Sequence, residues 1–215
     1  MKYLLKRILV SSLFIFCFPV AYADTLVSEV LSTQALIKTL QSGGHIIYMR
    51  HGMTDRKNAD RNKKMVDFGR CETQRNLSAA GKTQVKEMGL MIKSLNIPIG
   101  EVTSSPYCRT KDTAQAVFGH FTVDENLAFS LGKVEEESAK LGKYLHDAMM
   151  STKVNQQNTV FVGHTANLKD GLGIWPKPEG VAVIFKKSDD KIIYMGMIKP
   201  EQWQSHQSPL EQSVN

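Results

Sequence analysis

Apolar runs of strand length alternate with amphipathic segments along most of this chain of 215 residues. Helical spacing of apolar side chains predicts helices over residues 32–41, 78–95, 109–118 and 134–150. Short apolar or β-branched runs predict strands over residues 45–49, 101–104, 121–123, 159–162, 181–185 and 192–197. Because strands and helices alternate, we expect an α/β fold, a three-layer α/β/α sandwich on a mostly parallel sheet. The last two strands are expected to form an antiparallel hairpin at one edge.

Single residues mark where some of these elements begin and end. Ser78 is a preferred N-cap for the second helix, and Gly119 follows the third helix, where a left-handed C-cap is common. Residues 52–76 are polar and basic without a clear period, which predicts a long loop or lid. The basic side chains from Arg56 to Lys64 either steer an anionic substrate or are simply solvated.

The N-terminus has the layout of a secretory signal peptide. A basic start precedes an apolar stretch, residues 8–20, that is shorter than the roughly 20 residues needed to span a bilayer. Ala21 and Ala23 then form a small-x-small cleavage site, and an uncleaved anchor is the alternative. We expect export to the periplasm with no stable membrane span after cleavage. The predicted organisation is a signal peptide (1–23), a single domain (24–200) and a polar C-terminal tail (201–215).

The charge balance argues against a nucleic-acid-binding protein. The signal segment holds three of the 27 Lys and Arg residues, which leaves 24 against 21 Asp and Glu. No basic run is dense enough to indicate nucleic acid, and an anion-binding crevice accounts for part of the small excess. Nothing in the sequence indicates an oligomeric state.

Two cysteines remain after cleavage, because Cys17 lies in the signal segment. In an oxidising compartment Cys71 and Cys108 are candidates for a disulfide that would tie the loop before Arg75 to the one carrying Arg109. The alternative is two separate buried thiols, since the sequence supplies no distance between them. A Cys/His metal site is not expected, because no second close-spaced cysteine is present.

Polar motifs directly follow three of the predicted strands. Arg50-His51-Gly52 follows the first of these strands, Arg109 comes shortly after the second, and His164 follows the third. The carboxyl ends of strands in an open α/β sheet border one crevice, so these side chains can meet. Arginine stays charged and matches phosphate oxygens in a bidentate manner, and neutral imidazole can attack phosphorus. The pattern therefore predicts phosphoryl-transfer chemistry.

In this order and at these strand ends, the residues resemble the histidine phosphatase superfamily, also called the phosphoglycerate-mutase-like fold. The resemblance covers roughly residues 45–185. It implies that His51 attacks phosphorus and forms a phosphohistidine, while Arg50, Arg109 and His164 hold the phosphate oxygens. It also implies that the reaction needs neither a metal nor another cofactor.

Three further residues are candidates for binding the substrate. Gly52 allows either a close approach of the backbone to an anion or merely a tight turn. Thr54 would add a hydroxyl, as the threonine of Arg-His-Gly-x-Thr does in part of the family. Arg75 either supplements the phosphate pocket or lies on the surface.

The general acid is the least defined part of the pattern. The resemblance implies a carboxylate from the segment that follows the helix after Arg109. The candidates are Glu125, Glu135 and Glu136, with Asp124 and Glu137 beside them. For the three consecutive glutamates, the alternative is favourable charge at a helix start. Glu179 is a further candidate at the lip of the pocket.

These observations predict an exported, metal-independent phosphomonoester hydrolase of the histidine acid phosphatase type. Its partner would be a small phosphorylated substrate, and an envelope sugar phosphate, such as one of the lipopolysaccharide core, is one possibility. Two alternatives stay open at this point. One is a phosphomutase of the same family, and the other is a non-catalytic periplasmic protein that binds phosphate or polyanions.

Overall fold

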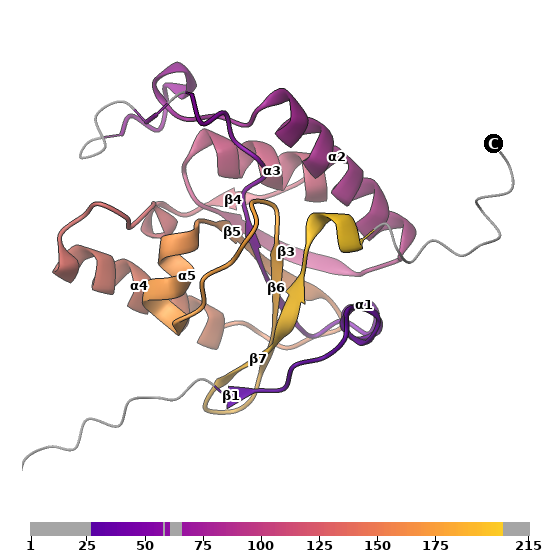
Figure 1. The fold of residues 1–215 in the computed structure, drawn as a ribbon. Helices are drawn as coiled ribbons and strands as arrows, with labels where there is room; N and C mark the ends of the chain where they lie inside the picture. Colours follow the sequence, from indigo (N-terminus) through magenta and orange to yellow (C-terminus); the bar gives the residue numbers. More distant parts are fainter. Residues whose placement is uncertain (1–26, 58, 61–65, 204–215) are drawn as a thin grey trace, which may run out of the picture.

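A sheet of seven strands forms the centre of the molecule, with helices on both faces (Figure 1). The computed structural model describes residues 27–57, 59–60 and 66–203. The strands are β1 (Val27–Ser28), β2 (Ile46–Arg50), β3 (Ile99–Ser104), β4 (Thr122–Val123), β5 (Asn158–Gly163), β6 (Ala182–Lys187) and β7 (Ile192–Ile198). The α-helices are α1 (Thr33–Gln41), α2 (Ala79–Ser94), α3 (Cys108–Phe118), α4 (Glu135–Met150) and α5 (Thr165–Leu172).

The strand order is β1-β7-β6-β2-β5-β3-β4. Strands β2, β5, β3 and β4 run parallel, and β6 pairs antiparallel with both β2 and β7. The hairpin expected at one edge therefore lies within the sheet. The two-residue strand β1, which was not predicted, pairs in parallel with β7 and forms the edge. Two residues are too short to give a period in the sequence.

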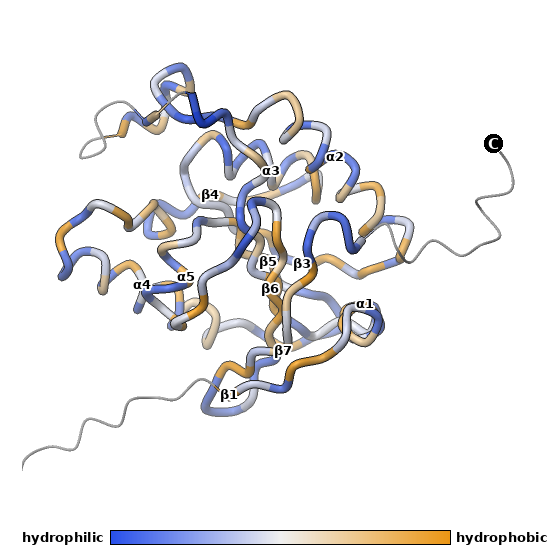
Figure 2. Tube along the Cα trace, in the orientation of Figure 1, coloured by the Kyte–Doolittle hydropathy of each residue, from blue (hydrophilic) through white to orange (hydrophobic). Residues whose placement is uncertain are grey.

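Alternate side chains of the central strand β2 face two separate cores, as expected for a sheet covered on both faces. Ile47 and Met49 pack with the buried residues of α1, α2 and α3. Ile46 and Tyr48 pack with those of α4 and α5. Figure 2 shows the hydrophobic residues along the strands at the centre of the fold. The predicted three-layer α/β/α sandwich is confirmed.

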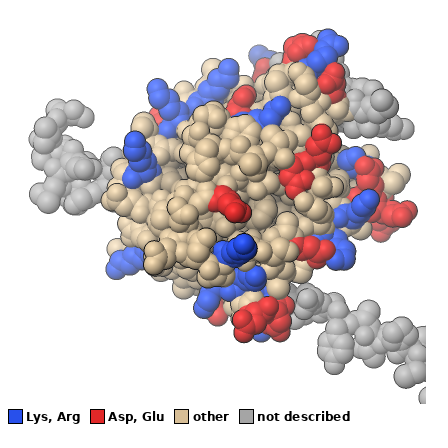
Figure 3. All heavy atoms as spheres, turned by 180° about the vertical axis from the view of Figure 1, so that it is seen from behind, with Lys and Arg blue, Asp and Glu red and all other residues tan. Residues whose placement is uncertain are grey.

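The expected helix boundaries follow from local capping. The Ser78 side chain accepts a hydrogen bond from the backbone N–H of Gly81 (3.0 Å), so it caps α2. Gly119 ends α3 with φ of +77°, a left-handed conformation that glycine adopts without a Cβ clash. On the face seen in Figure 3, acidic and basic side chains are interspersed, with no broad surface of a single sign.

The predicted domain boundary at residue 200 is too early. A short 3-10 turn, Pro200–Gln202, leads to Trp203, whose side chain is 1% exposed and belongs to the core beneath α1 and α2. The polar composition of the C-terminus hid this contact, because a single tryptophan gives no periodic signal. The domain therefore includes at least Trp203.

The predicted signal peptide and most of the predicted tail lie outside the described residues. Among residues 27–57, 59–60 and 66–203, no helix has the length and apolar character needed to cross a membrane.

Replacing Trp203 with alanine is expected to lower the free energy of unfolding by about 3–5 kcal/mol, because it removes a large buried side chain from the core. Urea unfolding of the purified protein measures this change. Trp175→Ala is the matched control, because the Trp175 side chain is 45% exposed and its loss should change the unfolding free energy by roughly 1 kcal/mol or less. Equal losses in the two variants would contradict the placement of Trp203 in the core.

Candidate active site

The carboxyl ends of three parallel strands meet at one edge of the sheet. Arg50 at the end of β2 is level with Gly163 at the end of β5, and Ser104 at the end of β3 is level with Val162. The residues that follow these strands, His51 and His164 among them, are therefore brought together. The convergence expected from the sequence is present.

His51 is 2% exposed and borders a cavity. Its Nδ1 lies 2.9 Å from the backbone carbonyl oxygen of Gly52. A carbonyl only accepts, so Nδ1 carries the hydrogen and Nε2 keeps its lone pair. Burial, together with the nearby Arg109 guanidinium, holds the pKa of His51 well below its ordinary 6.5. The imidazole is therefore neutral at physiological pH.

His164 lies beside His51, with 5.5 Å between the ring centroids. Its Nε2 is hydrogen-bonded to Ser105 Oγ (2.8 Å). The Tyr48 hydroxyl fixes the backbone, since it donates to the His164 carbonyl (2.7 Å) and accepts from the His164 N–H (2.8 Å). A Cβ on Gly163 would lie 2.3 Å from this hydroxyl, so only glycine fits there. Burial and the Arg109 charge also lower the pKa of His164 well below 6.5.

Arg109, at the start of α3, is fully buried. Its Nη1 donates to Asp60 Oδ1 (3.0 Å) and to the backbone carbonyl of Arg75 (3.3 Å). The guanidinium carbon lies 4.4 Å from the ring centroid of Tyr107 and 5.6 Å from that of Phe129. A carboxylate and two aromatic faces thus offset the cost of burying this charge.

The carboxylate of Glu179 contacts a second set of cationic side chains, separate from Arg109. It is 6% exposed and accepts from Arg50 Nη2 (3.2 Å), while Arg75 Nη2 lies 3.9 Å away. It also accepts from the backbone N–H and the hydroxyl of Thr54, both at 3.0 Å. Arg50 Nη1 donates to the Pro176 carbonyl (3.2 Å). Glu179 therefore fixes the loop after β2 against the guanidinium of Arg50.

Several nitrogen donors of this cluster have no hydrogen-bond partner among the described residues. They are Nε of Arg50, Nε of Arg75, Nε and Nη2 of Arg109, and Nδ1 of His164. Buried donors are costly when unpaired, and Nε with Nη2 is the edge of a guanidinium that grips two oxygens at once. When Ser105 donates to His164 Nε2, the Nδ1 of His164 carries a hydrogen as well. The set is suited to a tetrahedral oxyanion such as phosphate.

These groups lie at the inner end of a cavity of about 870 Å³. Arg50, His51 and Arg75 line it, and Arg109 and His164 lie behind Asp60 and Phe129, which also line it. No group of three or more His, Cys, Asp or Glu side chains within residues 27–57, 59–60 and 66–203 is arranged to hold a metal ion. The cationic donors above are the groups that can take an anion.

The structure corrects two of the predicted substrate contacts. The Gly52 N–H donates to Thr113 Oγ1 (3.0 Å), and a Cβ on Gly52 would lie 2.4 Å from the Val85 side chain, so this glycine packs against α2 and α3. Thr54 donates to Glu179 and is 7% exposed. Both residues shape the loop behind the pocket. Arg75, by contrast, does line the pocket.

The predicted general acids do not line the cavity. Glu135 and Glu136 are exposed in the first turn of α4, where they favour the helix dipole, and Glu125 is exposed in a 3-10 turn. Asp124 accepts a hydrogen bond from Tyr144, and Glu137 pairs with Lys133. Within the described part of the chain, the two lining carboxylates are Asp60 and Glu179. The sequence indicates Glu179 only as a lip residue, and Asp60 lies in a loop without a motif.

Cys71 and Cys108 form a disulfide, with their Cα atoms 5.7 Å apart. The bridge joins the 3-10 turn before Arg75 to the first residue of α3, next to Arg109. Gln74 reinforces the junction, because its side-chain oxygen accepts from the Cys108 N–H (2.9 Å). Of the two arrangements that the sequence left open, the structure has the bridged one.

Comparison with known proteins agrees with this geometry. The family model described as the histidine phosphatase superfamily (branch 1) matches residues 46–166, more than half of the chain. A phosphoserine phosphatase of Entamoeba histolytica aligns at 17% identity with a TM-score of 0.55, over 74% of this chain and 98% of that one. An ecdysone phosphate phosphatase of Bombix mori, solved with tungstate, aligns at 14% identity with a TM-score of 0.51, over 73% and 92%. Identities this low show a shared fold. A search of curated proteins gave no match.

Because these two histidines are neutral in the folded protein, we expect the free energy of unfolding to fall as the pH is lowered. Folded His51 and His164 bind a proton only well below pH 6.5, whereas the unfolded chain binds it near 6.5. The unfolded state therefore takes up more protons as the pH falls below about 6.5, and each histidine lowers the unfolding free energy by up to about 1.4 kcal/mol per pH unit. Urea unfolding between pH 7.5 and 5 measures the slope. His51→Gln should reduce it, and an unchanged slope would contradict the buried, neutral state.

Proposed function

Because the chain belongs to the histidine phosphatase superfamily, we propose that it hydrolyses a phosphomonoester through a phosphohistidine on His51. One observation carries the proposal. Unpartnered donors of Arg50, Arg109 and His164 lie near the imidazole of His51, which lines the cavity and whose Nδ1 is bonded to the Gly52 carbonyl, so that Nε2 keeps its lone pair. Arginine donors bind a phosphate group in the ground state and hold the charge that spreads over its oxygens in the transition state.

In the first step, Nε2 of neutral His51 forms a bond to phosphorus while the bond from phosphorus to the ester oxygen breaks. The Gly52 carbonyl supports this role, since it keeps the hydrogen on Nδ1. In the second step, water adds to phosphorus, the nitrogen–phosphorus bond breaks, and phosphate leaves with His51 neutral again. No metal is required, because the guanidinium groups supply the positive charge.

The leaving oxygen needs a proton, and neither lining carboxylate is well placed to give one. Asp60 is bonded to Arg109, and Glu179 is bonded to Arg50 and Thr54. We propose that water in the cavity protonates the leaving group, and that the hydroxide so formed is neutralised by the proton that the attacking water releases in the second step. Aryl phosphates, whose leaving oxygen is a weak base, depend least on this proton, so p-nitrophenyl phosphate is the simplest substrate for a first assay.

Export to the periplasm is part of the proposal. The signal-like N-terminus motivates it, and the Cys71–Cys108 disulfide supports it, because disulfides persist in oxidising compartments. An exported phosphatase meets phosphorylated components of the envelope, so a sugar phosphate of that layer is the substrate class to test first.

His51→Ala is expected to lower kcat for p-nitrophenyl phosphate by about 10³-fold or more, because it removes the nucleophile. Phosphate release by the purified protein lacking residues 1–23 gives the rate. A sample quenched during turnover should carry acid-labile, base-stable phosphate, which His51→Ala should lack. His146→Ala on α4 is the matched histidine control and should stay within about twofold of the wild type.

Hydrolysis that survives His51→Ala would refute the histidine mechanism. Phosphate binding without turnover in the wild type would indicate the non-catalytic alternative. Transfer of phosphate to another hydroxyl of the same substrate would indicate a mutase.

Glu179→Gln is expected to lower kcat/KM by roughly 10- to 100-fold, because it leaves the partly buried Arg50 guanidinium without its anionic partner. Glu135→Gln is the control, since Glu135 is exposed and outside the cavity, and its kcat/KM should change by less than about twofold. The same assay serves both variants. A large loss in Glu135→Gln with none in Glu179→Gln would restore the glutamate of α4 as the general acid.

A further inference from the structure

The cavity is larger than a phosphate group needs. Its volume of about 870 Å³ lies in the range of about 300–1,000 Å³ that holds a drug-sized ligand. The buried donors at its inner end account for one phosphate. The remaining space is available to the part of the substrate that leaves.

Burial separates this outer part from the phosphate end. His51 and Glu179 are 2% and 6% exposed, whereas Trp175 and Leu131 at the mouth are 45% and 62% exposed. Trp175 and Leu131 give the outer part an apolar wall, which is distinct from Phe129 beside Arg109 and His164 at the inner end. A half-exposed indole beside a pocket is suited to lie against the body of a ligand.

Three exposed basic side chains also line the outer part: Arg56, Lys177 and Lys199. They come from separate segments: the loop after β2, the loop between α5 and β6, and the residue that follows β7. Their convergence on one cavity is thus a product of the fold and not a basic run in the sequence. The Lys177 Nζ lies 5.6 Å from the ring centroid of Trp175, which places a cation beside the apolar wall.

The charge of these side chains is not compensated locally. The two lining carboxylates are already bonded to inner arginines, Asp60 to Arg109 and Glu179 to Arg50. Arg56, Lys177 and Lys199 form no ion pair with a residue in the described part of the chain. The outer part of the cavity therefore has a net positive field next to an aromatic surface, which favours an anionic group.

We propose that the outer part of the cavity is a second anion subsite, which binds a phosphate or carboxylate carried by the leaving group. The preferred substrate is then a phosphomonoester with a second anionic group on a compact body of sugar size. The inference rests on the proposed function and names its substrate class. Each anion has its own donors: the buried arginines for the phosphate that reacts, and Arg56, Lys177 and Lys199 for the group that leaves.

Three 6-phosphates test the subsite: glucose 6-phosphate, 6-phosphogluconate and glucose 1,6-bisphosphate. Their leaving groups carry no second anion, a carboxylate and a phosphate, respectively. We expect kcat/KM to be about tenfold higher for the two substrates with a second anionic group than for glucose 6-phosphate, mainly through KM. Raising the salt from 50 to 500 mM should reduce this preference, because exposed charges are screened.

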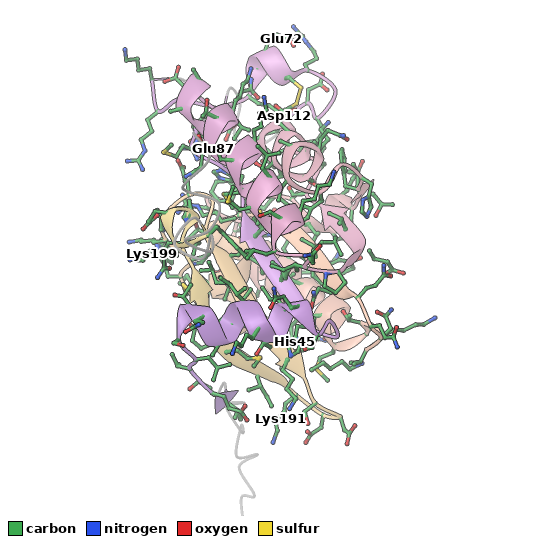
Figure 4. The ribbon with its side chains drawn as sticks, turned by 90° about the vertical axis from the view of Figure 1, so that its right-hand side faces the viewer. His45, Glu72, Glu87, Asp112, Lys191 and Lys199 are labelled. Carbon is green, nitrogen blue, oxygen red and sulfur yellow. A yellow bond between two sulfur atoms is a disulfide. The ribbon has the colours of Figure 1, made fainter. Side chains whose placement is uncertain are left out.

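The double variant Lys177→Gln/Lys199→Gln should reduce the preference to within about twofold. Lys191→Gln is the control, since Lys191 lies at the end of the molecule away from Lys199 in Figure 4 and does not line the cavity. The control should keep the wild-type preference.

Equal kcat/KM values for the three substrates in an active enzyme would overturn the subsite and leave the phosphatase proposal intact. Loss of preference in Lys191→Gln as well would assign the effect to overall charge and also overturn the subsite.

If p-nitrophenyl phosphate is not hydrolysed at all, the proposed function fails. Calorimetric titration with glucose 1,6-bisphosphate and with inorganic phosphate then decides the subsite: tighter binding of the bisphosphate that depends on Lys177 and Lys199 supports it, and equal binding refutes it.

Discussion

The fully buried guanidinium of Arg109 is the constraint on which the site depends. A charge removed from water is costly unless other groups surround it. Here Asp60 and the Arg75 carbonyl contact one edge of the guanidinium, and two aromatic rings lie over its faces. These partners use only Nη1 and the π faces. The edge formed by Nε and Nη2 keeps its donors, so burial fixes the direction from which an anion can be bound.

Burial, reinforced by the same positive charge, keeps the imidazoles neutral. Burial and Arg109 both disfavour a proton on His51 and His164, so the pKa of each lies well below 6.5. A nucleophilic imidazole needs a lone pair, and a phosphate site needs cations. The two needs do not conflict, because the cations that attract the substrate also repel the proton from the nitrogen that would attack it.

Much of this site could be predicted from the sequence, because its parts follow strands. An apolar run locates a strand, and parallel register brings Arg50, His51 and His164 to one edge without further information. The role of Glu179 had no such signal, since its contacts with Arg50 and Thr54 join residues far apart in the chain. For the same reason the sequence does not show that Gly52 and Thr54 donate to Thr113 and Glu179 instead of lining the cavity. A motif fixes residue types, but not which of them face the cavity.

The disulfide restrains the long loop that supplies part of the site. The segment between β2 and α2 contributes Asp60 and Arg75, yet its regular structure among the described residues is one 3-10 turn and one isolated bridge. A loop of this kind loses much conformational entropy when it is ordered. The bridge spans a sequence separation of 37 residues, and closing such a loop in the unfolded chain corresponds to roughly 4 kcal/mol. Because one end of the bridge is Cys108, the constraint acts directly beside Arg109. The Arg75 carbonyl and the Asp60 carboxylate, which contact the Arg109 guanidinium, belong to the loop that the bridge restrains.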